Sequence, residues 1–120
     1  MYMQIFFQTK KLELRDDEKS FMARRIEGLN KFFSPYAHVY IDVEQTRASH
    51  NGKDLYYVSI KIDDGQYKYF TEEYQDGVRK AFDHAYGDMY RVVRRDRGRA
   101  RAILKSTGRR FKNMFRRKAR

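Results

Sequence analysis

Residues 75–97, QDGVRKAFDHAYGDMYRVVRRDR, decide the fold, because they read as one long amphipathic helix. Its apolar residues recur at spacings of three and four, which places them on one helical face: Val78, Phe82, Ala85, Met89 and Val92. We expect this face to cover a core. From Arg91 onward the same helix becomes almost purely basic.

The positive charge of the chain is concentrated at its C-terminal end. Residues 91–120 hold 14 of the 27 Lys and Arg residues and one of the 16 acidic residues, Asp96. A helix dipole stabilises an exposed charge by less than about 1 kcal/mol, which is too little to account for so many cations. A near-neutral body with a strongly basic end indicates a polyanionic partner, nucleic acid first and an anionic membrane second.

A second helix is expected over residues 16–33, with Asp16 as its N-cap. Its buried face is predicted to consist of Met22, Ile26, Leu29 and Phe33. Gly28 inside it is interpreted as allowing close packing on a sheet. Pro35 ends this helix, because the residue before a proline is forced out of helical geometry.

Four segments alternate with the period of two that is typical of strands: residues 3–8, 37–45, 54–63 and 66–73. The Asp64-Gly65 hairpin signal and short connections predict that the last three form an antiparallel meander. The predicted fold is therefore α+β, in the order β-α-β-β-β-α, with both helices on one face of a four-stranded sheet. The pattern leaves open whether the first two strands pair in parallel.

We expect one folded domain over residues 1–97 and a basic, flexible tail over residues 98–120. Gly98 and Gly108 should break any continuous helix, apart from an amphipathic turn or two near residues 109–118. The chain has no cysteine, no apolar run of about 18 residues and no signal-peptide pattern, so we expect a cytoplasmic protein without a transmembrane segment.

No catalytic or metal-binding motif is recognisable. The sequence contains no H-E-x-x-H, no Gly-rich phosphate loop and no G-x-S-x-G. Asp63 and Asp64 could resemble a metal pair, but the predicted turn explains them. We therefore predict a protein with no enzymatic activity, no metal and no cofactor.

Tyrosines are frequent in and next to the predicted strands, and aromatic residues on a sheet can stack on RNA bases. Tyrosine also simply favours strands. Acidic residues on the same strands, such as Asp42, Glu44 and Glu72, should repel phosphates. We therefore expect nucleic acid to bind the helices and the tail, where arginine favours bidentate phosphate contacts. The predicted RNA-binding residues are Arg24, Arg25, Lys31, Lys80, Arg91, Arg94, Arg95, Arg97, Arg99 and Arg101.

Several segments, in this order, carry a family resemblance: Leu12-Glu13-Leu14, Leu29-Asn30-Lys31-Phe32-Phe33, AHVYIDVE at 37–44, Ala81-Phe82-Asp83, and the run containing Arg91, Arg94 and Arg95. Over residues 3–97 the chain resembles the short form of the ribosome hibernation-promoting factors, the ribosome-associated inhibitor or sigma-54 modulation protein family.

The resemblance implies a fold similar to double-stranded RNA-binding domains. It also implies binding to the small ribosomal subunit and its rRNA, in the channel for messenger and transfer RNA, which would inhibit translation in idle or stressed cells. The dimerising domain of the long form is absent, so we expect a monomer off the ribosome. Two alternatives stay open. One is a general RNA- or DNA-binding module of the same fold, and the other is a membrane-surface or protein-binding module that uses residues 109–118.

Overall fold

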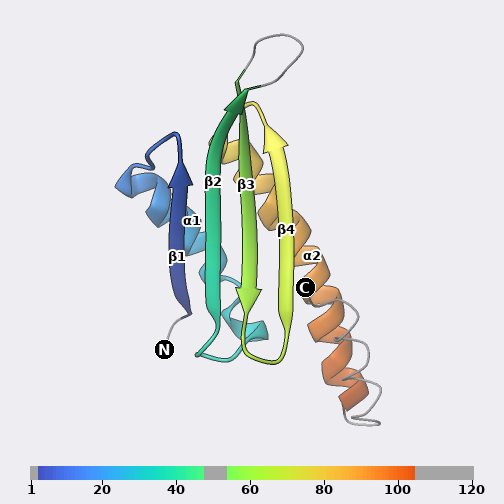
Figure 1. Ribbon diagram of the computed structural model, residues 1–120. Coiled ribbons are helices and arrows are strands. Elements are labelled where there is room, and N and C mark those ends of the chain that lie inside the picture. Colours follow the sequence, from blue (N-terminus) through green and yellow to red (C-terminus); the bar gives the residue numbers. More distant parts are fainter. Residues whose placement is uncertain (1–2, 48–53, 105–120) are drawn as a thin grey trace.

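The computed structural model describes residues 3–47 and 54–104. Its elements follow the predicted order, with one added 3-10 helix (Figure 1). They are β1 (Gln4–Lys10), α1 (Asp16–Glu27), the 3-10 helix η1 (Asn30–Phe32), β2 (His38–Arg47), β3 (Asp54–Asp63), β4 (Lys68–Gln75) and α2 (Val78–Leu104). The predicted tail beyond residue 104 lies outside the described residues.

The sheet has the strand order β1-β2-β3-β4. β1 pairs with β2 in parallel, and the other two pairs are antiparallel, so the question that the sequence left open is settled. Both helices cover the same face of the sheet (Figure 1). That face is made of fully buried aliphatic residues, including Val39, Ile41, Ile60 and Ile62. The α+β architecture is therefore confirmed.

The first helix ends earlier than predicted. α1 stops at Glu27, and the chain continues through Gly28 into η1, although Leu29 and Phe33 are buried as expected. A Cβ atom on Gly28 would lie 3.1 Å from the Arg25 carbonyl oxygen and 3.4 Å from the Tyr86 hydroxyl of α2, with no sheet atom within 4 Å, so the predicted packing of this glycine on the sheet is wrong.

The predicted N-cap is also wrong by one residue. Arg15 precedes the first helical residue, and its backbone N–H donates to Glu18 Oε1 at 3.0 Å. A carboxylate at the third helical position supplies half of a capping box. An aspartate cap is therefore not needed at this helix end.

The long helix differs from the prediction at both ends and in one core position. Gln75 still belongs to β4, and α2 continues through Gly98 to Leu104. One glycine costs a helix about 1 kcal/mol, which is not enough to end it. Phe82, Ala85 and Met89 are fully buried as predicted, but Val93 replaces the half-buried Val92 on the core face.

Tyr69 of β4 gives the fold a measurable dependence on alkaline pH. Its side chain is 2% exposed and meets the edge of Phe33 at 5.8 Å between ring centroids. Burial raises the pKa of the Tyr69 hydroxyl, and burial also raises the pKa of Tyr57 to about 12. A tyrosine in the unfolded chain titrates near pH ~10. Above that pH the unfolded state loses protons that the folded state retains, so stability falls as pH rises.

We predict that Tyr69→Phe reduces this alkaline loss of stability. Urea unfolding at a series of pH values should show a shallower decline between about pH 10 and 12, because each such tyrosine contributes up to about 1.4 kcal/mol per pH unit. Tyr36→Phe is the matched control, because Tyr36 is 76% exposed. In this variant the free energy of unfolding should decline with pH as steeply as in the unchanged chain. Equal slopes for Tyr69→Phe and the unchanged chain would contradict the prediction.

Candidate nucleic-acid interface

Aromatic side chains fill the seam between α2 and the two helices α1 and η1. The rings of Phe21 of α1 and Phe82 of α2 pack edge to face, with their centroids 5.9 Å apart. Those of Phe32 of η1 and Tyr90 of α2 pack in the same way, with their centroids 6.3 Å apart. Tyr86 lies between Phe82 and Tyr90 on α2 and stacks on both rings, with a centroid distance of 6.1 Å in each pair. Residues 82, 86 and 90 are four apart, so they share one side of α2. We call these five residues the aromatic ladder.

Basic side chains rest on the faces of this ladder. The guanidinium carbon of Arg79 lies 3.9 Å from the Phe21 centroid, and that of Arg25 lies 4.8 Å from the Tyr86 centroid. Lys31 Nζ lies 5.3 Å from the centroid of Phe32. An aromatic face attracts a cation but carries no net charge, so it orders the side chain without cancelling the charge.

Arg97, which follows the aromatic ladder along α2, also lies against aromatic rings. Its guanidinium carbon lies 4.4 Å from the Tyr67 centroid and 5.6 Å from the Phe33 centroid. Burial raises the pKa values of Tyr67 and Tyr86, although the neighbouring Arg97 and Arg25 act in the opposite direction. Arg25, Lys31, Arg79 and Arg97 form the set that we call the aromatic-held cations.

Three other predicted residues instead contact carboxylates. Lys80 pairs with Asp76 at 3.6 Å, and Arg91 pairs with Asp88 one turn earlier on α2. Arg95 Nε lies 3.4 Å from Asp96, which is 1% exposed although it is the single acid of residues 91–120. The two exposed pairs, Lys80–Asp76 and Arg91–Asp88, contribute at most about 1 kcal/mol each to stability. In all three pairs the carboxylate offsets a positive charge locally.

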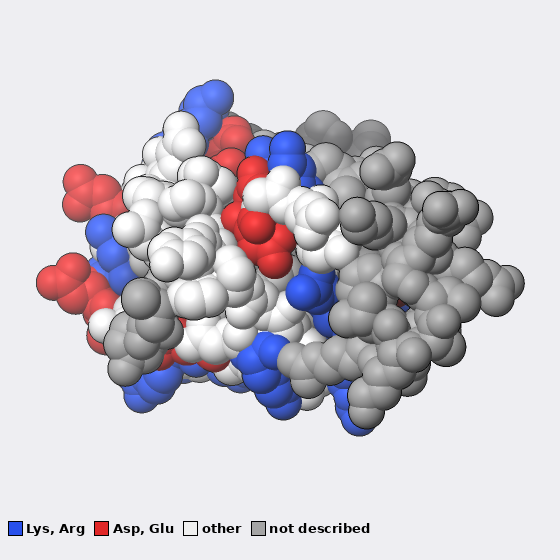
Figure 2. Space-filling view, turned by 90° about the horizontal axis from the view of Figure 1, so that it is seen from below, with Lys and Arg blue, Asp and Glu red and all other residues white. Residues whose placement is uncertain are grey.

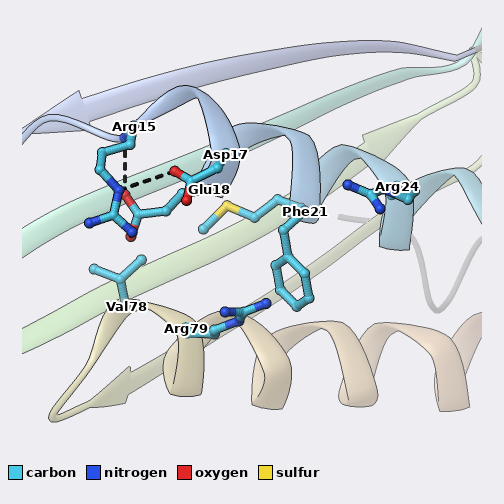
Figure 3. Close-up of a pocket in the computed structure, with 8 residues that line it drawn as sticks. Arg15, Asp17, Glu18, Phe21, Arg24, Val78 and Arg79 are labelled. Atoms are coloured by element: carbon cyan, nitrogen blue, oxygen red, sulfur yellow. Dashed lines mark hydrogen bonds and ion pairs between the residues drawn. The ribbon is translucent and has the colours of Figure 1, made fainter.

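The remaining predicted residues are spread along the helices. Arg24 lines a pocket of about 400 Å³ between the N-terminal halves of α1 and α2, together with Phe21 and Arg79 (Figure 3). Arg94 is exposed on α2. Arg99 and Arg101 belong to the last turns of α2, and their side chains lie outside the description.

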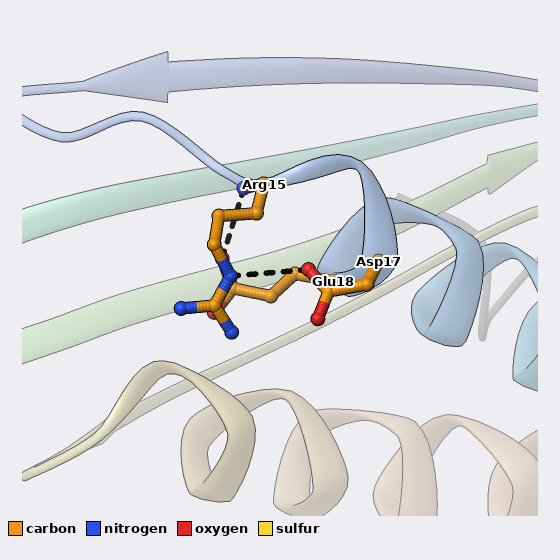
Figure 4. A network of polar contacts seen from close by, with 3 residues as sticks. All are labelled: Arg15, Asp17 and Glu18. Atoms are coloured by element: carbon orange, nitrogen blue, oxygen red, sulfur yellow. Dashed lines mark hydrogen bonds and ion pairs between the residues drawn. The ribbon is translucent and has the colours of Figure 1, made fainter.

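A small polar network closes one side of that pocket. Arg15 Nε donates to Asp17 Oδ1 at 3.1 Å, and a Glu18 oxygen lies 4.0 Å from the Arg15 guanidinium (Figure 4). The hydrogen bond from Arg15 lowers the pKa of Asp17. The Arg15 guanidinium therefore interacts with carboxylates at the start of α1, whereas Arg24 and Arg79 contact no described carboxylate.

The set of predicted RNA-binding residues does not include Arg79, although among the described cations it lies nearest to an aromatic ring centroid. The signal was present in the sequence, since Phe82, Tyr86 and Tyr90 recur every four residues beside the apolar stripe. Such a second aromatic stripe marks the side of α2 that faces another helix, and Arg79 precedes Phe82 by three residues on that side.

The charged groups are unevenly placed on the surface. Viewed from below, Lys and Arg side chains lie mainly around the margin of the described surface, and a group of Asp and Glu lies near its centre (Figure 2). Within residues 3–47 and 54–104, no three His, Asp or Glu side chains are arranged to hold a metal ion. No helix in this described part is long and apolar enough to cross a membrane.

Comparison with known proteins identifies a family and a similar fold. Residues 5–101 match the family described as "Sigma 54 modulation protein / S30EA ribosomal protein". No curated protein matches the chain significantly. The crystal structure of the Thermus thermophilus Protein Y N-terminal domain superposes with a TM-score of 0.62 at 17% identity, covering 77% of this chain and 97% of that chain. At this identity the structural match supports the fold alone.

The contact between Arg79 and Phe21 can be measured by a double-mutant cycle. We expect Arg79→Met and Phe21→Leu to show a coupling free energy of about 0.5–1 kcal/mol in urea unfolding, because each variant removes one partner of the same cation–π contact. The control cycle combines Arg91→Met with Phe21→Leu, since Arg91 pairs with Asp88 instead. Its coupling should be near zero, and equal coupling in both cycles would contradict the interpretation.

Proposed function

The chain belongs to the sigma 54 modulation protein / S30EA ribosomal protein family, and from this premise we propose that it inhibits translation by occupying the mRNA–tRNA channel of the small ribosomal subunit. The family consists of non-enzymatic, ribosome-associated proteins. Binding without chemistry agrees with a site that consists of ordered cations. We propose that the protein acts as a monomer in the cytoplasm during stress or idling of the ribosome.

The observation that supports this proposal best is the row of cations on the aromatic ladder. Immobilising a long, flexible side chain on binding costs about 0.5–1.5 kcal/mol. Arg25 and Arg79 already rest on rings in the free protein, so part of that cost is met before RNA arrives. Contacts to phosphates position a protein on RNA and carry little sequence information, which suits recognition of rRNA by its shape.

We assign different roles to the two sets of basic residues. Among the aromatic-held cations, Arg25 and Arg79 are proposed, together with Arg24 and Arg94, to contact rRNA phosphates directly. Lys80, Arg91 and Arg95 are proposed to contribute less, because each has a carboxylate beside it. α2 continues to Leu104 and includes the backbone of Arg99 and Arg101, so we place the end of the folded domain at residue 104 and the start of the basic tail at residue 105.

Charge-matched substitutions test this assignment. Arg25→Met and Arg79→Met should each weaken binding to the small subunit about tenfold, since a hydrogen bond to a charged group contributes about 1.5–3 kcal/mol at most sites. Each should also reduce the slope of log affinity against log salt by about one. Lys80→Met and Arg91→Met remove the same charge and should have a smaller effect. Co-sedimentation with ribosomal subunits over a series of salt concentrations measures all four.

Two outcomes of that experiment would overturn the proposal. Failure of the unchanged protein to migrate with the small subunit at moderate salt would exclude ribosome binding. Equal affinity for naked duplex RNA and for ribosomes would favour a general RNA-binding module of the same fold. Equal losses in all four variants would refute the assignment of roles while leaving the proposed function intact.

The basic segment after α2 is proposed to add affinity and not placement. Residues 105–120 contain eight Lys and Arg residues and no acid, so their binding to RNA should release counterions. Removing them should flatten the salt dependence of binding, while hydroxyl-radical footprints on rRNA should stay at the same nucleotides. A footprint that moves after truncation would show that this segment also selects the site.

A further inference from the structure

The sheet face opposite the helices carries one register row that is mainly aromatic. Phe6 pairs with Tyr40, Tyr40 with Lys61, and Lys61 with Phe70, so the row crosses all four strands. Phe6 is 46% exposed, Tyr40 is 40% exposed and Phe70 is 38% exposed. Single exposed aromatic residues are ordinary, but Phe6 and Tyr40 lie side by side in this row, with Phe70 beyond Lys61, and such a group of exposed aromatics in one row is typical of an interaction site.

The side chains of this row are ordered against one another. The rings of Phe6 and Tyr40 stack at 5.4 Å with an interplanar angle of 18°, and His38 lies beside both. Lys61 Nζ lies 5.8 Å from the Tyr40 centroid. Tyr40 thus already accepts one cation, and the row offers a preformed surface to a further cationic or apolar group.

Carboxylates stand in the neighbouring register row. Asp42 and Glu72 are both exposed there, on either side of Ser59. Neither has an ion-pair partner among the described residues, although Glu72 accepts a hydrogen bond from the Tyr57 hydroxyl at 2.8 Å. Carboxylates would repel a nucleic-acid backbone, whereas they bind arginine in bidentate geometry. The chemistry of this face therefore fits an arginine-rich peptide with apolar anchor residues.

The chain itself contains such a peptide directly after α2. Residues 105–120, KSTGRRFKNMFRRKAR, combine eight basic residues with Phe111, Met114 and Phe115, and contain no acid. We propose that this segment binds the outer face of the sheet in the free protein, with its arginines on the Phe6–Tyr40–Phe70 row and on Asp42 and Glu72.

The position of α2 makes this contact possible. Arg97 lies over Tyr67 in the turn between β3 and β4, so α2 passes the end of the sheet at that level. Phe70, the third residue of β4, is close to the same end (Figure 1). The helix continues for seven residues, or about 10 Å, and the 16 residues that follow can span up to about 50 Å. Such a tether gives a millimolar effective concentration, so a weak contact suffices.

Docking of residues 105–120 on the sheet would compete with the proposed binding of RNA, but it does not require that binding. A given arginine cannot contact the sheet and an RNA phosphate at the same time. Docking would therefore hold the segment on the sheet until a denser array of phosphates displaces it. Because the docking involves only the free protein, it can be tested in the absence of ribosomes.

Photo-crosslinking of the full chain tests the contact. A benzophenone amino acid is introduced at Phe70, the purified protein is irradiated at low concentration without RNA, and cross-linked peptides are mapped by mass spectrometry. We expect cross-links from position 70 to residues 105–120 of the same chain. The same probe at Tyr36, which is 76% exposed in the loop before β2, is the control and should give few such cross-links. Mixing isotopically labelled and unlabelled chains separates contacts within a chain from contacts between chains.

A charge variant in the probe-carrying chain gives a second readout. Asp42→Asn with Glu72→Gln should reduce the yield of the cross-link about fivefold, because two surface ion pairs are lost. Glu13→Gln with Glu27→Gln removes the same charge before and at the end of α1, and should leave the yield unchanged. Circular dichroism confirms that each variant is folded. Absence of cross-links to residues 105–120, equal yields at positions 70 and 36, cross-links solely between chains, or no effect of the Asp42 and Glu72 changes would each overturn the proposal.

Discussion

Burial of a single face of the sheet is the constraint on which the rest of this structure depends. The aliphatic residues of β2 and β3 are fully buried on that face, and Phe82 and Met89 of α2 are buried in the same core. A four-stranded sheet with one apolar face has room for two helices side by side on it. The side of α2 that turns away from the sheet but toward α1 must then be filled. The aromatic ladder fills it, and its rings lie against Arg25 of α1 and Arg79 of α2.

The contacts between α1 and α2 show how a protein with a near-neutral body can still present ordered cations whose charge is not cancelled by a carboxylate. Carboxylates order cations by cancelling their charge, as Asp88 does for Arg91. Aromatic rings order Arg25 and Arg79 without adding a negative charge. The distribution of partners therefore matters more than the number of basic residues. A count of Lys and Arg along α2 would weight Arg91 and Arg79 equally, although only one of them keeps its charge available.

Features that depend on local pattern could be predicted from the sequence, and features that depend on packing between elements could not. Strand alternation and the Asp64-Gly65 turn were sufficient for the element order, and β3 was predicted with its observed bounds. The end of α1 at Gly28 was not predicted, because the buried Leu29 and Phe33 extend the apolar spacing of α1 past the glycine, while the chain there forms the 3-10 helix η1 instead. The continuation of α2 through Gly98 shows the opposite case, in which a local breaker is too weak to end a long helix. The binding residues stay a prediction, and Arg79 was left out of the predicted set although its place beside the aromatic stripe of α2 can be read from the sequence.

The two faces of the domain carry opposite chemistry, and α2 connects them. On the helical face, cations rest on rings; on the outer face of the sheet, rings lie beside carboxylates. Near the end of the sheet, Arg97 is the last cation that the described side chains place on an aromatic face, over Tyr67 and Phe33. Beyond it the chain is basic with no acid up to its end at residue 120. In the docking that we propose, the basic segment is attracted to the carboxylates of its own sheet and repelled by the cations of its own helices. If the helical face binds rRNA as proposed, the phosphates there compete with the sheet for that segment.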